Sequence, residues 1–250
     1  ETVLAFIMEP VGGAATGALV APDPYYARIR EICDDYGVLL IYDEVMTGAG
    51  RTGAFLAAEH WGIAPDIVAL SKGFGAGYAP LGAMVAHRRL VEPVLSAGGF
   101  VHGFTYAGNP LACAAGAAVL EEIDRAGLLA NATRMGARLK EELEGLKGRF
   151  PFIGDVRGKG LLLAFELVSD CETMAPLAKE IDAYLHLVEE AYSRGLIIYS
   201  RRTRGGVEGD HFMVCPPLIV NESQVGEIME KLTDSLHALA QRFDLPEGNC

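Results

Sequence analysis

The stretch Val38-Leu39-Leu40-Ile41-Tyr42-Asp43-Glu44 decides the fold, because an unbroken apolar run ends there in two carboxylates. Such a short run is typical of a strand that is covered on both faces. The same pattern recurs at residues 3–8 and 66–71, and residues 82–86 form a fourth candidate strand. A helix over residues 24–36 separates the first two strands and ends at Gly37. Crossovers of this length predict an α/β sheet of mixed or parallel order.

The pattern changes near Gly127, where a second and smaller α/β domain is expected to begin. Apolar residues recur at helical spacing after Asn131, and strand-like runs follow at residues 161–167, 196–199 and 211–215. A capping pair, Asn221 and Gln224, marks the start of the last helix. We therefore predict domains at residues 1–130 and 131–250. The chain begins with Glu1 almost directly in a strand, so we expect upstream sequence to be missing.

Charge and composition exclude several classes of partner. The formal net charge is −12, which disfavours nucleic acid and anionic membranes as partners. No apolar run reaches the length of a membrane span, and no signal peptide is visible. The five cysteines contain no CxxC pair and the six histidines are dispersed, so we expect neither a disulfide framework nor a metal site. A cytoplasmic location is the simplest expectation.

Asp43 and Lys72 both follow predicted strands, at the edge where α/β sheets bind ligands. Gly73, Gly75 and Gly77 surround Lys72, so backbone there can approach a ligand closely. A lysine becomes nucleophilic when burial or another cation destabilises its ammonium. An aspartate beside a pyridine nitrogen keeps that nitrogen protonated. Spacing alone leaves open a solvated loop lysine and a capping aspartate.

The strand before Asp43-Glu44 also has a second interpretation. An apolar strand followed by these two carboxylates is the Walker B pattern of P-loop NTPases, in which they handle Mg²⁺ and water. That function needs a GxxxxGK[ST] loop, which this chain does not contain, and finding one in upstream sequence would revive this interpretation.

Several motifs in order resemble the class III aminotransferases, the omega-type group of fold-type I pyridoxal-phosphate enzymes. The signature runs from Leu39 through Asp43-Glu44-Val45-Met46-Thr47-Gly48 and Gly50-Arg51-Thr52-Gly53 to Pro65–Gly73 and Pro80-Leu81-Gly82-Ala83. Glu9-Pro10-Val11, Thr105–Pro110, Gly209-Asp210-His211 and Cys215-Pro216-Pro217-Leu218 fit as well. The resemblance implies a mixed, mostly parallel sheet with helices on both faces, of which residues 1–130 are the C-terminal part.

The resemblance also implies roles for individual residues. Lys72 forms the Schiff base with pyridoxal 5'-phosphate and moves the proton of the amino carbon. Asp43 pairs with the pyridine nitrogen, and Val45 packs against one face of the ring; an ordinary core valine is the alternative. Thr105 binds coenzyme phosphate across the interface of a homodimer with shared active sites, or else is a turn hydroxyl. Glu9 steers substrate or forms a structural ion pair.

Two departures from the family limit the prediction. The N-terminal half, which supplies the phosphate cup and the aromatic residue on the other ring face, is absent from this sequence. The arginine for a substrate carboxylate is one of Arg201, Arg202 and Arg204, and we choose Arg204 because it lies in a glycine-rich loop. A solvated basic loop is the alternative.

The predicted reaction is ping-pong transamination from an amine or amino acid to a keto acid, either pyruvate or 2-oxoglutarate. An aminomutase or a decarboxylase on the same coenzyme is an alternative, and a non-catalytic binding module is another. The sequence does not identify the amino donor.

Overall fold

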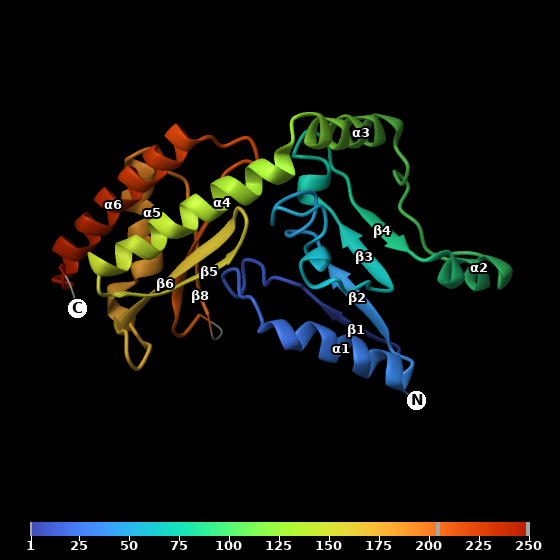
Figure 1. The fold of residues 1–250 in the computed structure, drawn as a ribbon, viewed down its shortest axis with the longest axis horizontal. Helices are drawn as coiled ribbons and strands as arrows, with labels where there is room; N and C mark the ends of the chain where they lie inside the picture. The colour runs from blue at the N-terminus through green and yellow to red at the C-terminus, as the bar shows by residue number, and fades with distance from the viewer. Residues whose placement is uncertain (1, 204–205, 249–250) are drawn as a thin grey trace. The chain divides into compact units, whose positions relative to one another are not determined.

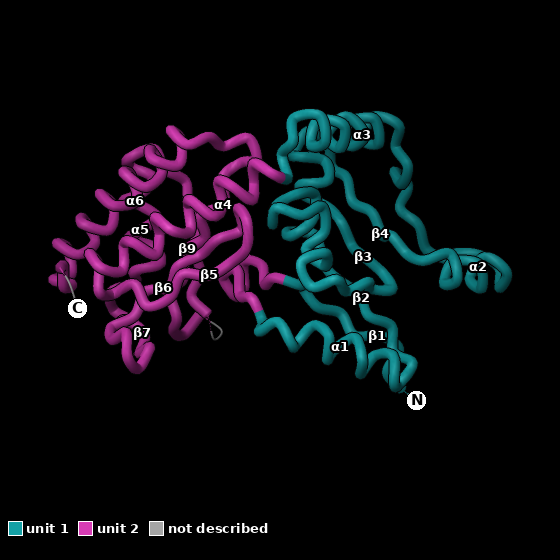
Figure 2. Tube along the Cα trace, in the orientation of Figure 1, with its two compact units in different colours: residues 1–10, 21–129 teal, residues 11–20, 130–250 magenta. Residues whose placement is uncertain are grey.

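The computed structural model describes residues 2–203 and 206–248 (Figure 1). Contacts divide the chain into two compact units (Figure 2). The first unit comprises residues 1–10 and 21–129, and the second comprises residues 11–20 and 130–250. The sequence had placed residues 11–20 in the first domain. They belong to the second unit through long-range contacts that no local pattern reveals.

A four-stranded sheet with the order β1-β2-β3-β4 forms the first unit. Strands β1, β2 and β3 are parallel, and β4 is antiparallel to β3, which gives the mixed order that the crossovers predict. The bounds are Ala5–Met8 for β1, Leu39–Asp43 for β2, Ile67–Leu70 for β3 and Ala83–Ala86 for β4.

Helix α1 (Asp23–Tyr36) connects β1 to β2 and packs Cys33 with Leu40 and Tyr42 of β2. It ends at Gly37, whose φ of 66° lies in the left-handed region that glycine adopts without steric cost. Helices α2 (Arg88–Ser96) and α3 (Pro110–Arg125) follow β4. The sequence did not predict α2, which buries no residue and contains an internal proline.

The edge strands differ from the prediction of strands covered on both faces. Phe6 and Ile7 of β1 are 37% and 61% exposed, and Met84 and Val85 of β4 are 59% and 53% exposed. Both strands pair with only one neighbour in this sheet. The apolar side chains there are available for further packing.

The second unit has an antiparallel sheet of order β5-β6-β9-β8, with β7 added to β6. Its strands are β5 (Ile153–Lys159), β6 (Leu162–Asp170), β7 (Ala175–Pro176), β8 (Tyr199–Arg202) and β9 (Asp210–Val214). Helices α4 (Leu128–Gly145), α5 (Ala183–Ser193) and α6 (Glu222–Phe243) share one apolar core with the sheet. The capping pair is confirmed, since Asn221 and Gln224 each accept the other's backbone N–H at 3.0 Å.

Strands β5 and β7 were not predicted, and β8 begins at Tyr199 instead of Leu196. Two glycines and three charged residues interrupt the apolar pattern of β5, because one face of this strand carries polar groups.

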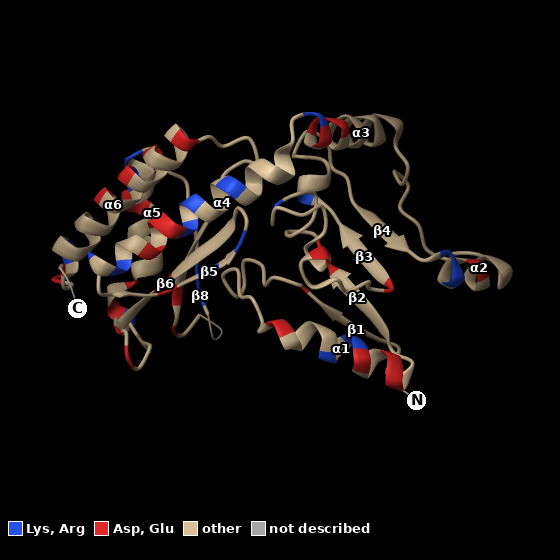
Figure 3. Cartoon of the chain, in the orientation of Figure 1, with Lys and Arg blue, Asp and Glu red and all other residues tan. Residues whose placement is uncertain are grey.

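In the described ranges, no helix combines the length and apolarity needed to cross a membrane. Lysine and arginine lie scattered among acidic residues on the helices of both units (Figure 3).

Candidate active site

Asp43 and Lys72 lie at the ends of two adjacent parallel strands. Asp43 is the last residue of β2 and lies in register with Ala69 of β3, and Lys72 follows β3 after Ser71. The carboxyl ends of parallel strands meet at one edge of a sheet, which is where α/β folds bind ligands. The structure therefore brings the two principal predicted residues to the same sheet edge.

The Asp43 carboxylate is half-buried and held at one oxygen. Its Oδ1 accepts the backbone N–H of Val45 at 3.0 Å, whereas no described residue donates to its Oδ2. Val45 lies in a turn over residues 45–50, which follows the end of β2. A carboxylate with one fixed and one available oxygen can accept a hydrogen bond from a protonated ring nitrogen.

Lys72 opens a short 3₁₀ helix (Lys72–Phe74) with a φ of 45°. This left-handed conformation costs a lysine on the order of 1 kcal/mol, so the surroundings must hold it. Gly75 N–H donates to the Lys72 carbonyl at 3.1 Å, and Ser71 Oγ donates to the Leu81 carbonyl at 3.0 Å. The Lys72 side chain is exposed, and its ammonium has no hydrogen bond or ion pair among the described residues.

Glycines allow the segments around Lys72 to pack closely. A Cβ on Gly75 would lie 2.7 Å from the Ala79 carbonyl oxygen, and one on Gly48 would lie 2.6 Å from Leu70 Cδ2. A Cβ on Gly116 of α3 would lie 2.3 Å from Leu81 Cδ2. Larger residues at these positions would displace the chain near Lys72.

Glu44 is a site residue whose role the sequence analysis missed. It is fully buried, and its carboxylate accepts hydrogen bonds from Thr47 Oγ1 and from the N–H groups of Ala57 and Ala58, the latter two at 2.9 Å. Burial raises the pKa of Glu44, and these three donors oppose that shift. The Walker B interpretation needs this carboxylate for Mg²⁺ and water, but protein donors already occupy it. Nothing in the local sequence indicates that Glu44, rather than Asp43, is the fully buried carboxylate of the pair.

Two other predicted residues lie at different places in the first unit. Glu9 follows β1 directly and is exposed at the carboxyl-end edge of the sheet. Thr105 lies on an exposed turn between α2 and α3, beside Phe104 and Tyr106, which are 78% and 81% exposed.

The arginines of the second unit have separate environments. Arg202 is buried and bonds both oxygens of Asp210, at 2.7 and 3.1 Å, together with Asp182 at 3.0 Å. Its guanidinium also lies over the Tyr184 ring, 4.6 Å from the ring centroid. These contacts make Arg202 part of a structural ion pair. Arg201 is exposed on β8, and Arg204 lies outside the described residues.

A row of ionisable residues crosses the second sheet in register: Asp155, Glu166, His211 and Arg201. Arg157 bonds Glu166 at 2.7 Å and donates to the Gly17 carbonyl at 2.7 Å. His211 Nε2 lies 3.0 Å from the Ala14 carbonyl oxygen, and burial lowers the pKa of this histidine. These contacts hold residues 11–20 on the sheet. The sequence could not reveal them, because the partners are far apart along the chain.

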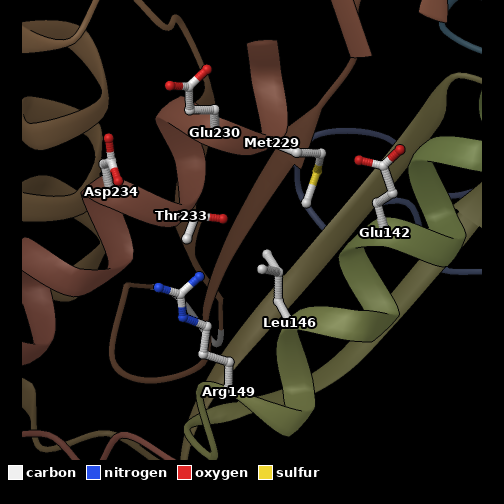
Figure 4. A pocket seen from close by; sticks show the side chains of 7 residues that line it. All are labelled: Glu142, Leu146, Arg149, Met229, Glu230, Thr233 and Asp234. Atoms are coloured by element: carbon white, nitrogen blue, oxygen red, sulfur yellow. The ribbon is translucent and has the colours of Figure 1, made fainter. Parts of the chain in front are cut away.

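The second unit also has a cavity of about 440 Å³ between α4 and α6 (Figure 4). Leu146 and Met229 lie among the charged side chains of Glu142, Arg149 and Glu230. None of the described residues predicted to bind coenzyme or substrate lines this cavity.

The residues at the sheet edge fit pyridoxal phosphate by their chemistry. The Lys72 amine, which has no partner among the described residues, can react with an aldehyde. The available Asp43 oxygen can accept a pyridinium N–H, and the glycine-rich turns permit close approach. A mixed α/β sheet with this pair defines the class of pyridoxal-phosphate enzymes of fold type I. Solved structures that resemble the chain are transaminases of this fold, one of them in its PLP-bound form.

The chain belongs to the class III aminotransferase family, whose sequence profile matches residues 1–236. An uncharacterized aminotransferase of Bacillus subtilis, YodT, is 38% identical over 97% of this chain and 55% of its own length. Taurine–pyruvate aminotransferase of Bilophila wadsworthia is 37% identical over 96% of this chain and 53% of its own length.

A crystal structure of a transaminase from the marine bacterium Virgibacillus has a TM-score of 0.90 and 35% identity, covering 96% of this chain and 54% of that chain. The chain thus spans about half the length of the curated relatives that it matches.

Proposed function

We propose that the complete protein is a pyridoxal-phosphate-dependent aminotransferase. It moves an amino group from an amine or amino acid to a keto acid such as pyruvate or 2-oxoglutarate. The observation that carries the proposal is the pair Asp43 and Lys72 at the carboxyl ends of neighbouring parallel strands, in a chain of the class III family.

When bound, the coenzyme supplies an electron sink that stabilises negative charge on the amino carbon of the substrate. Lys72 would hold the coenzyme through Nζ, and the same nitrogen would move a proton at the amino carbon. Asp43 Oδ2 would hold a proton on the ring nitrogen, while Oδ1 accepts the Val45 N–H. The Val45 side chain would pack against the ring.

Substrate recognition is assigned to Glu9 and Arg204. Glu9 follows β1 at the sheet edge that carries Asp43 and Lys72, where it can orient an amino group. The guanidinium of Arg204 forms a two-pronged hydrogen bond with a substrate carboxylate. We choose Arg204 over Arg202, because the guanidinium of Arg202 already donates its hydrogen bonds to Asp210 and Asp182.

The protein acts as a homodimer in which Thr105 binds the coenzyme phosphate of the partner subunit. The support is an exposed apolar segment around Thr105: Leu95, Phe100, Val101, Phe104, Tyr106 and Leu111 are each more than half exposed. Such a patch marks a protein interface. The free thiols of Cys33 and Cys113 support a cytoplasmic location.

The test is a donor screen on the complete gene product with added coenzyme. Amines and amino acids are offered with pyruvate or 2-oxoglutarate, and loss of keto acid is measured against loss of donor. We expect equal consumption of both substrates, abolished by Lys72→Ala and unchanged by Lys147→Ala, which removes a lysine of the second unit. Turnover of the donor without loss of keto acid would instead indicate a one-substrate reaction such as a mutase or decarboxylase.

A further inference from the structure

Glu44 connects four segments of the first unit. Its N–H donates to the Ala69 carbonyl at 2.9 Å, and its own carbonyl accepts the Gly48 N–H at 2.8 Å. Its carboxylate holds Thr47 and the first N–H groups of the 3₁₀ helix Ala57–Trp61. The end of β2, the neighbouring strand β3, the turn over residues 45–50 and this helix thus meet at one buried residue.

The turn that Glu44 holds also packs against the chain next to Lys72. A Cβ on Gly73 would lie 3.4 Å from Ala49 Cβ and 3.5 Å from the Gly48 carbonyl oxygen. Ala49 is buried and has a φ of 54°, so the turn keeps a strained conformation inside the fold. A shift of this turn would therefore reach both Val45, whose N–H fixes Asp43, and the helix that begins at Lys72.

We propose that Glu44 is a positioning residue, which fixes the Asp43 carboxylate and the Lys72 turn through its bonds to Thr47, Ala57 and Ala58. The inference rests on the proposed function, since it concerns how these two residues meet the coenzyme. Glu44 itself is fully buried directly after the end of β2, and we assign it no contact of its own with the coenzyme.

The hydrogen bonds explain why this position requires a carboxylate. Both oxygens accept backbone N–H groups, one from Ala57 and the other from Ala58. A glutamine has one acceptor oxygen, and its NH₂ group would face one of these N–H groups, so one buried donor would lose its partner. The N–H of the glutamine amide would point at the N–H of Ala57 or Ala58, and their repulsion would push the 45–50 turn away from the 3₁₀ helix Ala57–Trp61.

The experiment compares Glu44→Gln, Thr47→Val and Thr47→Ser in the complete gene product, with Glu59→Gln as the matched control. Glu59 caps the same 3₁₀ helix by accepting the Leu56 N–H at 2.7 Å, but it is exposed and outside the 45–50 turn. Pyridoxal phosphate is titrated into each apoprotein, and three readouts are recorded: the coenzyme Kd, the absorption maximum with its pH dependence, and the Tm of the apoprotein.

We expect Glu44→Gln to weaken coenzyme binding by about tenfold, the factor that corresponds to a change of about 1.4 kcal/mol. It should also shift the pH dependence of the absorption band, which a loss of stability alone would not move. Thr47→Val should weaken binding by about threefold, the lower end of one hydrogen bond. Thr47→Ser keeps the hydroxyl and should stay near the wild type, as should Glu59→Gln.

Wild-type affinity and an unchanged band in Glu44→Gln would overturn the inference, and so would an equal loss in Glu59→Gln. If Glu44→Gln does not fold, Thr47→Val decides by the same criteria. A wild-type protein that binds no pyridoxal phosphate refutes the proposed function itself. Normal wild-type binding with silent Glu44 and Thr47 variants refutes only the positioning role.

Discussion

Replacing Gly48 by alanine tests the packing behind the candidate active site. The added Cβ would lie 2.6 Å from Leu70 Cδ2 and 2.7 Å from the Glu44 carbonyl oxygen. Carbon atoms normally pack at about 3.5–4.0 Å, so the turn must move by about 1 Å. Leu70 is 5% exposed, and the Glu44 carbonyl already accepts the Gly48 N–H, so neither can yield freely.

The magnitude follows from two opposing effects. Overpacking costs about 1–3 kcal/mol, and the lower entropy of the unfolded chain with alanine returns about 0.4–1 kcal/mol. We expect a net loss of about 1–2 kcal/mol, equivalent to a drop in Tm of about 2–8 °C for a domain of this size. Binding of pyridoxal phosphate should weaken as well, because the displaced turn carries Val45.

Differential scanning calorimetry measures the effect, with Gly226→Ala in α6 as the control. A Cβ on Gly226 meets no atom within 4 Å, so alanine should stabilise this helix by about 0.5–1 kcal/mol. If Gly48→Ala unfolds at the wild-type temperature and binds coenzyme normally, the packing argument is refuted. A similar loss in Gly226→Ala would show that the difference in space does not matter.

Three further predictions concern charge. Arg202→Ala leaves the buried Asp210 carboxylate without its ion-pair partner and should destabilise the protein by about 3–5 kcal/mol. Arg201 is exposed, so Arg201→Ala should change the free energy of unfolding by less than about 0.5 kcal/mol. Urea unfolding of the two variants measures the difference. Burial lowers the pKa of His211 in the folded state, so the unfolded chain binds more protons once the pH falls below about 6.5. Stability should therefore be complete above that pH and decline as the pH falls toward the folded pKa, and His211→Gln should reduce this decline in urea midpoints measured between about pH 5 and 8. Asp43→Asn should weaken binding of pyridoxal phosphate and change the wavelength of its absorption maximum, while the Tm of the apoprotein stays nearly unchanged. An unaltered absorption spectrum would contradict the role of Asp43 as the partner of the ring nitrogen.

The sequence predicted those parts of the fold that rest on local patterns. The apolar run before Asp43 and its equivalent before Lys72 are strands β2 and β3, because a short continuous apolar run is itself a local signal of a buried strand. The stripe of Met135, Leu139 and Leu143 is buried in the core of the second unit. Strand β5 escaped prediction, because glycines and charged residues interrupt its apolar pattern, and one of these, Arg157, bonds the Gly17 carbonyl of residues 11–20.

The candidate site shows the same division between local and distant contacts. Asp43 and Lys72 could be chosen because each follows a strand, and strand ends have a known relation to ligands in α/β folds. The role of Glu44 depends on Ala57 and Ala58, and the ion pair of Arg202 depends on Asp210 and Asp182. Such pairings arise only when the chain has folded. Spacing in the sequence therefore does not distinguish a buried, hydrogen-bonded charged residue from a solvated one.

Reduction with borohydride tests the central claim most directly. The complete gene product is loaded with pyridoxal phosphate, reduced, digested and mapped by mass spectrometry. Our account predicts one stable phosphopyridoxyl adduct, on the peptide that contains Lys72. An adduct on a different lysine, or none in a protein that retains the coenzyme, would contradict the assignment of Lys72.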